Sequence, residues 1–134
     1  MSASLHHVSI TCQSLTTSLA FYQQFGFEIE KQYQDDKVHI VLLSNQTSAR
    51  IELFQFHHSP LTEYKEETCL PHIQRRGITH FAICVSDIET TKQQLSGTGK
   101  CSEISLARLG GFRYFFTLDP DGNQLEIIEE NNET

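Results

Sequence analysis

The chain has 134 residues with 17 acidic side chains against 10 Lys and Arg, a formal net charge of -7 with neutral His. This length is typical of one domain and is large enough to bury a core without structural metals or disulfides. Hydrophobic residues make up 38% of the chain, yet no stretch approaches the about 18 consecutive apolar residues of a membrane span. The acidic balance without a basic stripe argues against nucleic acid as a partner.

The cysteines and the N-terminal residues favour a cytoplasmic location. The four cysteines form no Cys-x-x-Cys pair, and Cys12 and Cys84 lie in alternating apolar segments where buried thiols are expected. The N-terminus lacks the charged segment and long apolar run of a secretion signal. We therefore expect a reduced, cytoplasmic protein that does not associate with membranes.

The first part of the chain predicts a strand, a helix and three further strands. Residues 5–12 alternate between apolar and polar side chains, which places His7 on the polar face of a strand. A helix follows, with Ser14 as its N-cap and Gly26 as a left-handed residue after its end. Three further strands, separated by turn-forming clusters, are expected at 27–33, 38–44 and 49–56.

Residues 57–77 break this pattern. They contain two prolines, three histidines and several charges, with little periodicity. We interpret them as a linker with a short helix near 63–69.

The pattern then restarts. Residues 78–85 alternate and place His80 on the polar face of a strand, as His7 is placed in the first half. Ser86 or Asp87 caps a second helix that ends at Gly97. The remaining strands are expected at 101–106, 112–118 and 124–129, with a turn at 119–122.

The histidine in the first strand and the glutamate in the last strand of each half recur at nearly the same spacing. His7 and His80 lie 73 residues apart, and Glu52 and Glu126 lie 74 apart. Because one such module alone leaves a sheet uncovered, we predict an α+β fold in which tandem βαβββ modules form one curved mixed sheet. Within a single domain, 1–134, the first module spans 1–56, the linker 57–77 and the second module 78–130.

Two imidazoles and two carboxylates fall on the polar faces of their strands, away from the helices: His7, Glu52, His80 and Glu126. Two carboxylates gathered in one cavity repel each other unless a cation lies between them. A divalent ion balances two Glu, and two neutral His complete an N2O2 set suited to Zn, Ni, Co, Mn or Fe(II). The alternative is four unrelated polar residues on a solvated face. The paired spacing favours the metal site.

Short motifs throughout the chain point to a known family. They are His-His-Val at 6–8, Ser-Leu-Ala-Phe-Tyr at 18–22, Phe-Gly-Phe at 25–27, Ile-Glu-Leu-Phe at 51–54, Gly-Ile-Thr-His-Phe-Ala at 77–82 and Asp-Pro-Asp-Gly-Asn-Gln-Leu-Glu at 119–126. With these motifs the chain resembles the vicinal oxygen chelate superfamily, most closely its glyoxalase I-like branch. The resemblance covers nearly the whole chain apart from the linker.

This resemblance implies paired βαβββ modules and a metal that binds substrates through two adjacent oxygens. Carried over by position, the ligands are His7, Glu52, His80 and Glu126, whereas His6 shares the apolar face of its strand. The metal acts as a Lewis acid that stabilises an enediolate. One ligand, Glu126 or Glu52, also moves the proton as general base and then acid.

Two positions depart from glyoxalase I. That enzyme normally has an Arg four residues after the first His and an Asn four after the first Glu, which help to hold glutathione. Thr11 and Phe56 stand there in this chain, so a charge-assisted partner for a glutathione carboxylate is missing. We expect a different substrate in a cavity lined by Thr11, Phe54, Phe56 and Arg113. Alternatively, Arg113 is a solvent-exposed residue that forms an ion pair with a carboxylate.

The leading functional expectation is a divalent-metal-dependent lyase or isomerase, similar to lactoylglutathione lyase, that acts on a small oxygen-chelating substrate. Two alternatives remain: a metal-independent protein that binds antibiotic-type small molecules, and an Fe(II) ring-cleavage dioxygenase. The resemblance also implies a homodimer, in which the site forms within one chain or between modules of two chains.

Overall fold

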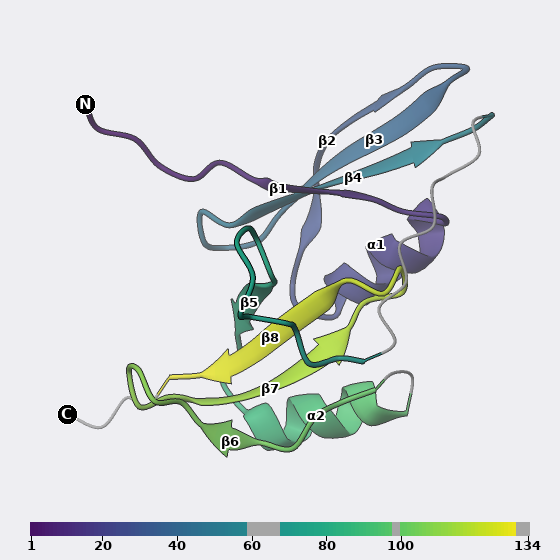
Figure 1. The fold of residues 1–134 in the computed structure, drawn as a ribbon. Coiled ribbons are helices and arrows are strands. Elements are labelled where there is room, and N and C mark those ends of the chain that lie inside the picture. The colour runs from purple at the N-terminus through teal and green to yellow at the C-terminus, as the bar shows by residue number, and fades with distance from the viewer. Residues whose placement is uncertain (59–67, 98–99, 131–134) are drawn as a thin grey trace. The chain divides into compact units, whose positions relative to one another are not determined.

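The computed structural model describes residues 1–58, 68–97 and 100–130. The chain divides into two compact units, Met1–Glu63 and Tyr64–Thr134, each with its own helix and strands (Figure 1). The boundary falls within the linker predicted at 57–77. The short helix expected near 63–69 lies outside the described residues except for its last two positions, which form a bend.

The first unit contains one helix and four strands: β1 (Val8–Thr11), α1 (Leu15–Gln23), β2 (Glu28–Gln34), β3 (Val38–Ser44) and β4 (Arg50–Phe56). The strand order in the sheet is β1-β4-β3-β2. The β1 strand runs parallel to β4, whereas the other neighbouring pairs are antiparallel. The first strand therefore lies beside the last one, which brings residues about forty positions apart onto neighbouring strands.

Local chain signals account for the ends of α1. The Ser14 hydroxyl accepts a hydrogen bond from the Thr17 N–H, which confirms the predicted N-cap. Beyond the helix, Gly26 has φ +86° and donates its N–H to the Gln23 carbonyl. Glycine adopts this left-handed conformation without a steric penalty, so the chain turns there towards β2.

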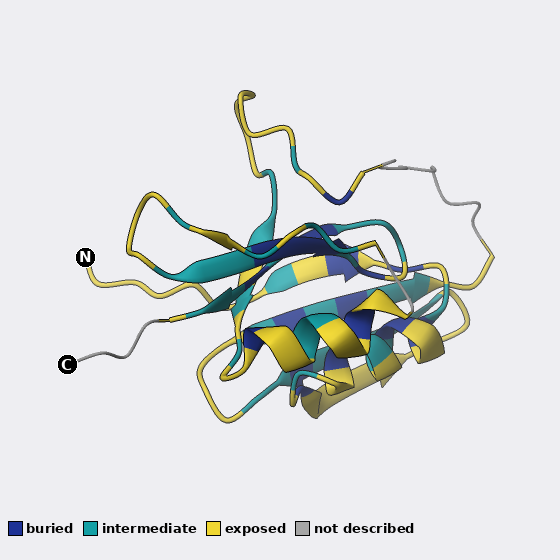
Figure 2. Ribbon diagram, turned by 90° about the horizontal axis from the view of Figure 1, so that it is seen from below, coloured by how far each residue is buried: buried dark blue, intermediate teal, exposed yellow. Residues whose placement is uncertain are grey.

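The apolar side of the first sheet packs with α1. In β1, β3 and β4, nearly completely buried residues are followed by partly or fully exposed ones, whereas β2 is exposed along its whole length (Figure 2). The buried strand residues are Ile10, Val41, Leu43, Ile51 and Leu53, and α1 adds Leu15, Ser18 and Tyr22. Alternation thus leaves Glu52, on β4, on the opposite face from the core.

The second unit repeats this topology with β5 (Phe81–Cys84), α2 (Ile88–Ser96), β6 (Ser105–Leu106), β7 (Arg113–Leu118) and β8 (Gln124–Glu129). Its sheet has the order β5-β8-β7-β6, and β5 runs parallel to β8. The predicted α+β fold with two βαβββ modules is confirmed. Its strands are organised as two four-stranded mixed sheets, one in each unit.

Hydrogen bonds fix the helix cap and the turn of the second unit. Of the two predicted caps of α2, Asp87 is the one used, because its carboxylate accepts from the Thr90 N–H. The bonds from Thr90 lower the pKa of Asp87. The turn at 119–122 is present, with the Gly122 N–H bonded to the Asp119 carbonyl. The β6 strand covers two residues of the predicted 101–106, and Cys101 forms only an isolated bridge with Thr117.

The core of the second unit consists of Ile88, Leu95, Phe115, Leu125 and Ile127. Cys12 in the first unit is buried as expected, but Cys84 is exposed, so the expectation of a buried thiol there is wrong. The reason is alternation, because Cys84 shares the exposed face of Ala82 on β5. None of the helices described is both long and apolar enough to cross a membrane.

Candidate metal site

A histidine and a glutamate meet in the first unit. His7 immediately precedes β1, and Glu52 is the third residue of β4. The parallel pairing of β1 with β4 places Ser9 opposite Glu52. His7 consequently lies on the same face as Glu52, with its Nε2 3.3 Å from Glu52 Oε1. Both side chains remain partly accessible, so the pair can take up a ligand from solvent.

The second unit contains the equivalent pair. His80 immediately precedes β5, Glu126 is the third residue of β8, and the parallel register places Ala82 opposite Glu126. His80 Nε2 lies 3.5 Å from Glu126 Oε1. The His80 ring also packs edge-on against Phe116, with ring centroids 5.0 Å apart. The duplicated fold therefore produces the same donor pair twice.

In both pairs the residue before the histidine contacts its other ring nitrogen. His6 Nδ1 lies 2.8 Å from His7 Nδ1, and Thr79 Oγ1 lies 2.8 Å from His80 Nδ1. A tautomer with the proton on Nδ1 satisfies this contact and leaves the Nε2 lone pair facing the carboxylate. Metal-binding histidines commonly have this arrangement, in which a second residue orients the ring.

The chemistry of these donors fits a divalent ion. Each pair offers one imidazole nitrogen and one carboxylate, which is half of an N2O2 set. Within the described residues, no three His, Cys, Asp or Glu side chains gather into a group that could hold an ion. Each unit by itself therefore offers one donor pair, His7–Glu52 in the first and His80–Glu126 in the second. Without an ion, each pair can form an ordinary ion pair when its imidazole is protonated.

Three residues predicted to line a substrate cavity belong to the first unit. Thr11, on β1, is opposite Phe54 in the register with β4. Phe54 and Phe56 alternate with the buried Leu53 and so lie on the Glu52 face. Their rings stack at a centroid distance of 6.1 Å, and Phe56 is 42% exposed. Phe54 and Phe56 thus form an apolar, partly accessible surface next to the Glu52 carboxylate on β4.

The fourth predicted cavity residue, Arg113, is held by carboxylates. Its guanidinium binds Glu89 of α2 and Glu129 of β8. These two bonds raise the pKa of Arg113 above its ordinary value, and the same contact lowers the pKa of Glu89. Arg113 therefore forms ion pairs, which was the second of the two roles predicted for it from the sequence.

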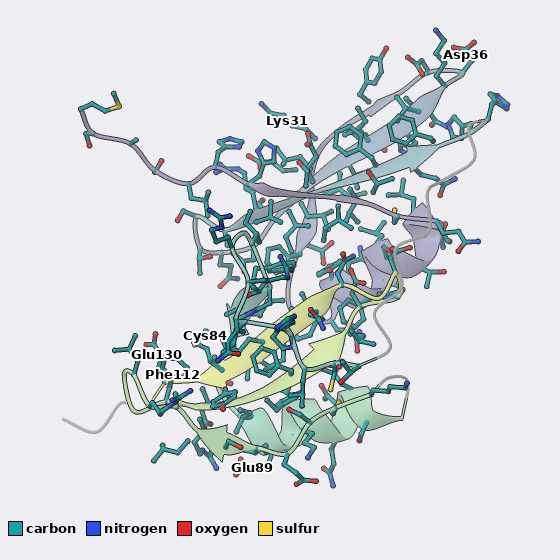
Figure 3. The ribbon with its side chains drawn as sticks, viewed as in Figure 1. Lys31, Asp36, Cys84, Glu89, Phe112 and Glu130 are labelled. Atoms are coloured by element: carbon teal, nitrogen blue, oxygen red, sulfur yellow. The ribbon has the colours of Figure 1, made fainter. Side chains whose placement is uncertain are left out.

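A cavity of about 750 Å³ opens in the second unit near the carboxyl ends of β5 and β8. Cys84 and Glu130, labelled in Figure 3, contribute to its lining together with Arg113. His80 and Glu126 are not among its lining residues. The cavity is therefore a neighbouring feature of the second sheet and not the place where the donor pair meets.

Three contacts around these pairs were not predicted from the sequence. They are the hydroxyl of Ser9 on Glu52, His6 on His7, and Thr79 on His80. Their positions in the sequence could have suggested these contacts. His6 and Thr79 directly precede His7 and His80, and Ser9 follows His7 by two residues.

Comparison with known proteins places this chain in a family. Residues 4–127 match the family model of the Glyoxalase/Bleomycin resistance protein/Dioxygenase superfamily. The Bacillus subtilis protein YwkD is 33% identical over 131 residues, which cover 95% of this chain and 97% of YwkD. The chain thus has a relative that matches it along nearly its full length.

Solved structures agree with this placement. A glyoxalase family protein from Bacillus cereus superposes with a TM-score of 0.78 at 18% identity, covering 94% of this chain and 93% of that one. The trypanothione-dependent glyoxalase I of Leishmania major has a TM-score of 0.67 at 25% identity, covering 96% and 88%. The chain is therefore a duplicated βαβββ protein, and each of its two modules contains a His–Glu pair. The chain belongs to the glyoxalase/bleomycin resistance/dioxygenase superfamily, and the resemblance found in its sequence is confirmed.

Proposed function

We propose that this protein is a divalent-metal-dependent, glyoxalase-like lyase or isomerase that acts on a small substrate with two adjacent oxygens. The observation that carries the proposal is the repeated pair of a histidine Nε2 facing a glutamate Oε1, at 3.3 Å in one unit and 3.5 Å in the other. Membership of the superfamily and the similarity to a glyoxalase I support this reading.

The ion would be held by His7, Glu52, His80 and Glu126. Two carboxylates neutralise a divalent charge, and the two imidazoles suit Zn, Ni, Co, Mn or Fe. When bound, the ion supplies a Lewis acid for a substrate oxygen. The ligands come from one chain or from two chains of a homodimer, because equivalent modules can exchange partners in a symmetric assembly.

The carboxylates would also carry out the proton transfer. Glu52 or Glu126 removes the proton from the carbon beside the substrate carbonyl and returns it to the neighbouring carbon, first as general base and then as general acid. Both carboxylates are partly accessible beside their imidazoles, so a substrate can reach either one.

The residues beside Glu52 would contact the substrate. Thr11, Phe54 and Phe56 offer a hydroxyl and two stacked rings, which favour a substrate with an apolar group over one with a carboxylate at this place. We do not include Arg113, because Glu89 and Glu129 already neutralise its charge.

Metal analysis after native purification tests the proposal. Wild-type protein is expected to contain a divalent metal, and His7→Ala and Glu126→Ala, one from each pair, are expected to lose most of it. Matched controls are His72→Ala and Glu103→Ala, exposed residues of the same types outside the pairs. Metal content in both pair variants equal to that of wild type would show that the assignment is wrong.

The same protein preparations separate the other reaction classes. Oxygen consumption with catechols would identify a ring-cleavage dioxygenase, and tight binding of small molecules by metal-free protein without turnover would identify a binding protein. Either result would overturn the proposed lyase or isomerase activity.

A further inference from the structure

The two donor pairs differ in the residue that lies opposite the carboxylate on the parallel strand. Ser9 is opposite Glu52 in the β1–β4 register, and Ala82 is opposite Glu126 in the β5–β8 register. Ser9 follows His7 by two residues, as Ala82 follows His80. The duplication therefore places a hydroxyl beside one carboxylate and a methyl group beside the other.

The Ser9 hydroxyl donates a hydrogen bond to Glu52 Oε1 over 2.7 Å. This oxygen is also the one that faces His7 Nε2. A hydroxyl bonded to an ionised carboxylate is a charge-assisted donor, and such bonds are shorter and stronger than those between neutral groups. Ser9 thus holds the Glu52 side chain in the position in which it meets His7.

Among the described residues, none gives Glu126 an equivalent side-chain hydrogen bond. Its polar side-chain contact within the part of the chain that the structure describes is the one to His80. Its neighbours across the sheet are Ala82 on β5 and Phe116 on β7, neither of which has a side-chain donor. The glutamate of the second unit therefore keeps a freedom of rotation that the glutamate of the first unit has lost.

We propose that Ser9 is a positioning residue that fixes Glu52 for metal binding and so makes the duplicated site asymmetric. This inference rests on the proposed function, because it takes Glu52 as a metal ligand. A ligand already held in place gives up less freedom when the ion binds, so Ser9 strengthens metal binding without touching the ion.

The test compares two side chains of the same shape at position 9. Ser9→Thr keeps the hydroxyl and Ser9→Val replaces it with a methyl group, and both β-branched residues are compatible with a strand. Metal-stripped protein is titrated with Co²⁺, and the affinity and the visible absorption spectrum are recorded. We expect Ser9→Val to bind Co²⁺ about 10-fold more weakly with a changed spectrum, in line with other residues that orient a ligand. Ser9→Thr is expected to stay close to wild type.

A gain-of-function variant and a control accompany this comparison. Ala82→Ser places the hydroxyl beside Glu126 and is expected to slow the release of Co²⁺. Ser105→Ala removes a hydroxyl from the exposed strand β6 and is expected to change neither the affinity nor the spectrum.

The outcomes separate this inference from the proposed function. If Glu52→Ala loses Co²⁺ binding while Ser9→Val binds as wild type does, the role of Ser9 is wrong and the metal site stands. If Glu52→Ala itself binds Co²⁺ as wild type does, the metal site is wrong and Ser9 has no ligand to position. Equal weakening in Ser9→Thr and Ser9→Val also overturns the inference, because the hydroxyl would then make no difference.

Discussion

His7 Nε2 lies 3.3 Å from Glu52 Oε1, although the two residues are 45 positions apart in the chain. The parallel pairing of β1 with β4 produces this contact, since it aligns the strand that follows His7 with the strand that contains Glu52. The parallel pairing of β5 with β8 does the same for His80 and Glu126. The contact thus depends on strand topology, and the topology occurs twice.

Replacing the hydroxyl that orients His80 should weaken metal binding. Thr79→Val removes the oxygen that lies 2.8 Å from His80 Nδ1 and leaves the size of the side chain nearly unchanged. We expect Co²⁺ affinity to fall about 10-fold, the lower end of the range for residues that orient a metal ligand. Thr16→Val, on the exposed side of α1, is the matched control. Unchanged affinity in Thr79→Val would show that this contact does not orient the imidazole.

Removing the N-cap of α1 should destabilise the first unit. Ser14→Ala leaves the Thr17 N–H without its side-chain acceptor. Chemical denaturation is expected to show a free energy of unfolding lower by about 1 kcal/mol. Ser14→Asp keeps a capping oxygen and should stay near wild type. A loss of the same size in Ser14→Asp would mean that the capping bond is not the cause.

The charge of Asp87 should contribute to stability in a defined pH window. Hydrogen bonds from Thr90 lower the pKa of Asp87 in the folded protein below its ordinary value. A group whose pKa is lower when folded stabilises the protein above its unfolded pKa, and this contribution is lost as the pH falls through the folded value. Asp87→Asn retains a capping oxygen but cannot titrate.

Urea denaturation at several pH values, from about pH 6 down to about pH 3, measures this contribution. The unfolding midpoint of wild type should fall more steeply towards low pH than that of Asp87→Asn. Parallel curves for the two proteins would contradict the assignment of this pH dependence to Asp87.

Arg113 should matter for stability and not for metal binding. Arg113→Leu removes the cation between Glu89 and Glu129 and leaves these two carboxylates near each other without it. We expect a lower melting temperature and an unchanged Co²⁺ affinity. A loss of Co²⁺ binding comparable to that of His80→Ala would place Arg113 in the site instead.

Alternation and turn chemistry predicted much of the fold. The bounds of β3 and β8, the cap at Ser14 and the turn that begins at Asp119 follow from residues close together in the chain. The same alternation placed Glu52 on the face opposite the core, because residues on neighbouring positions of a strand point to opposite sides.

The contacts that refine the donor pairs could not be predicted in this way. The bond between Ser9 and Glu52 depends on the register of two strands 43 residues apart and on the rotamers of both side chains. The local sequence pattern determines neither this register nor these rotamers. The exposure of Cys84 was missed for a related reason, since its strand has an open face that apolar composition alone does not reveal.

The proposed function requires both His–Glu pairs to bind one and the same ion. X-ray absorption spectroscopy of the zinc-loaded protein measures this directly, because scattering from imidazole rings reports how many histidines bind the metal. We predict two imidazoles among ligands at about 2.0–2.2 Å, and a single imidazole in both His7→Ala and His80→Ala. A wild-type spectrum with one imidazole or none, or a spectrum that neither substitution changes, would contradict the claim.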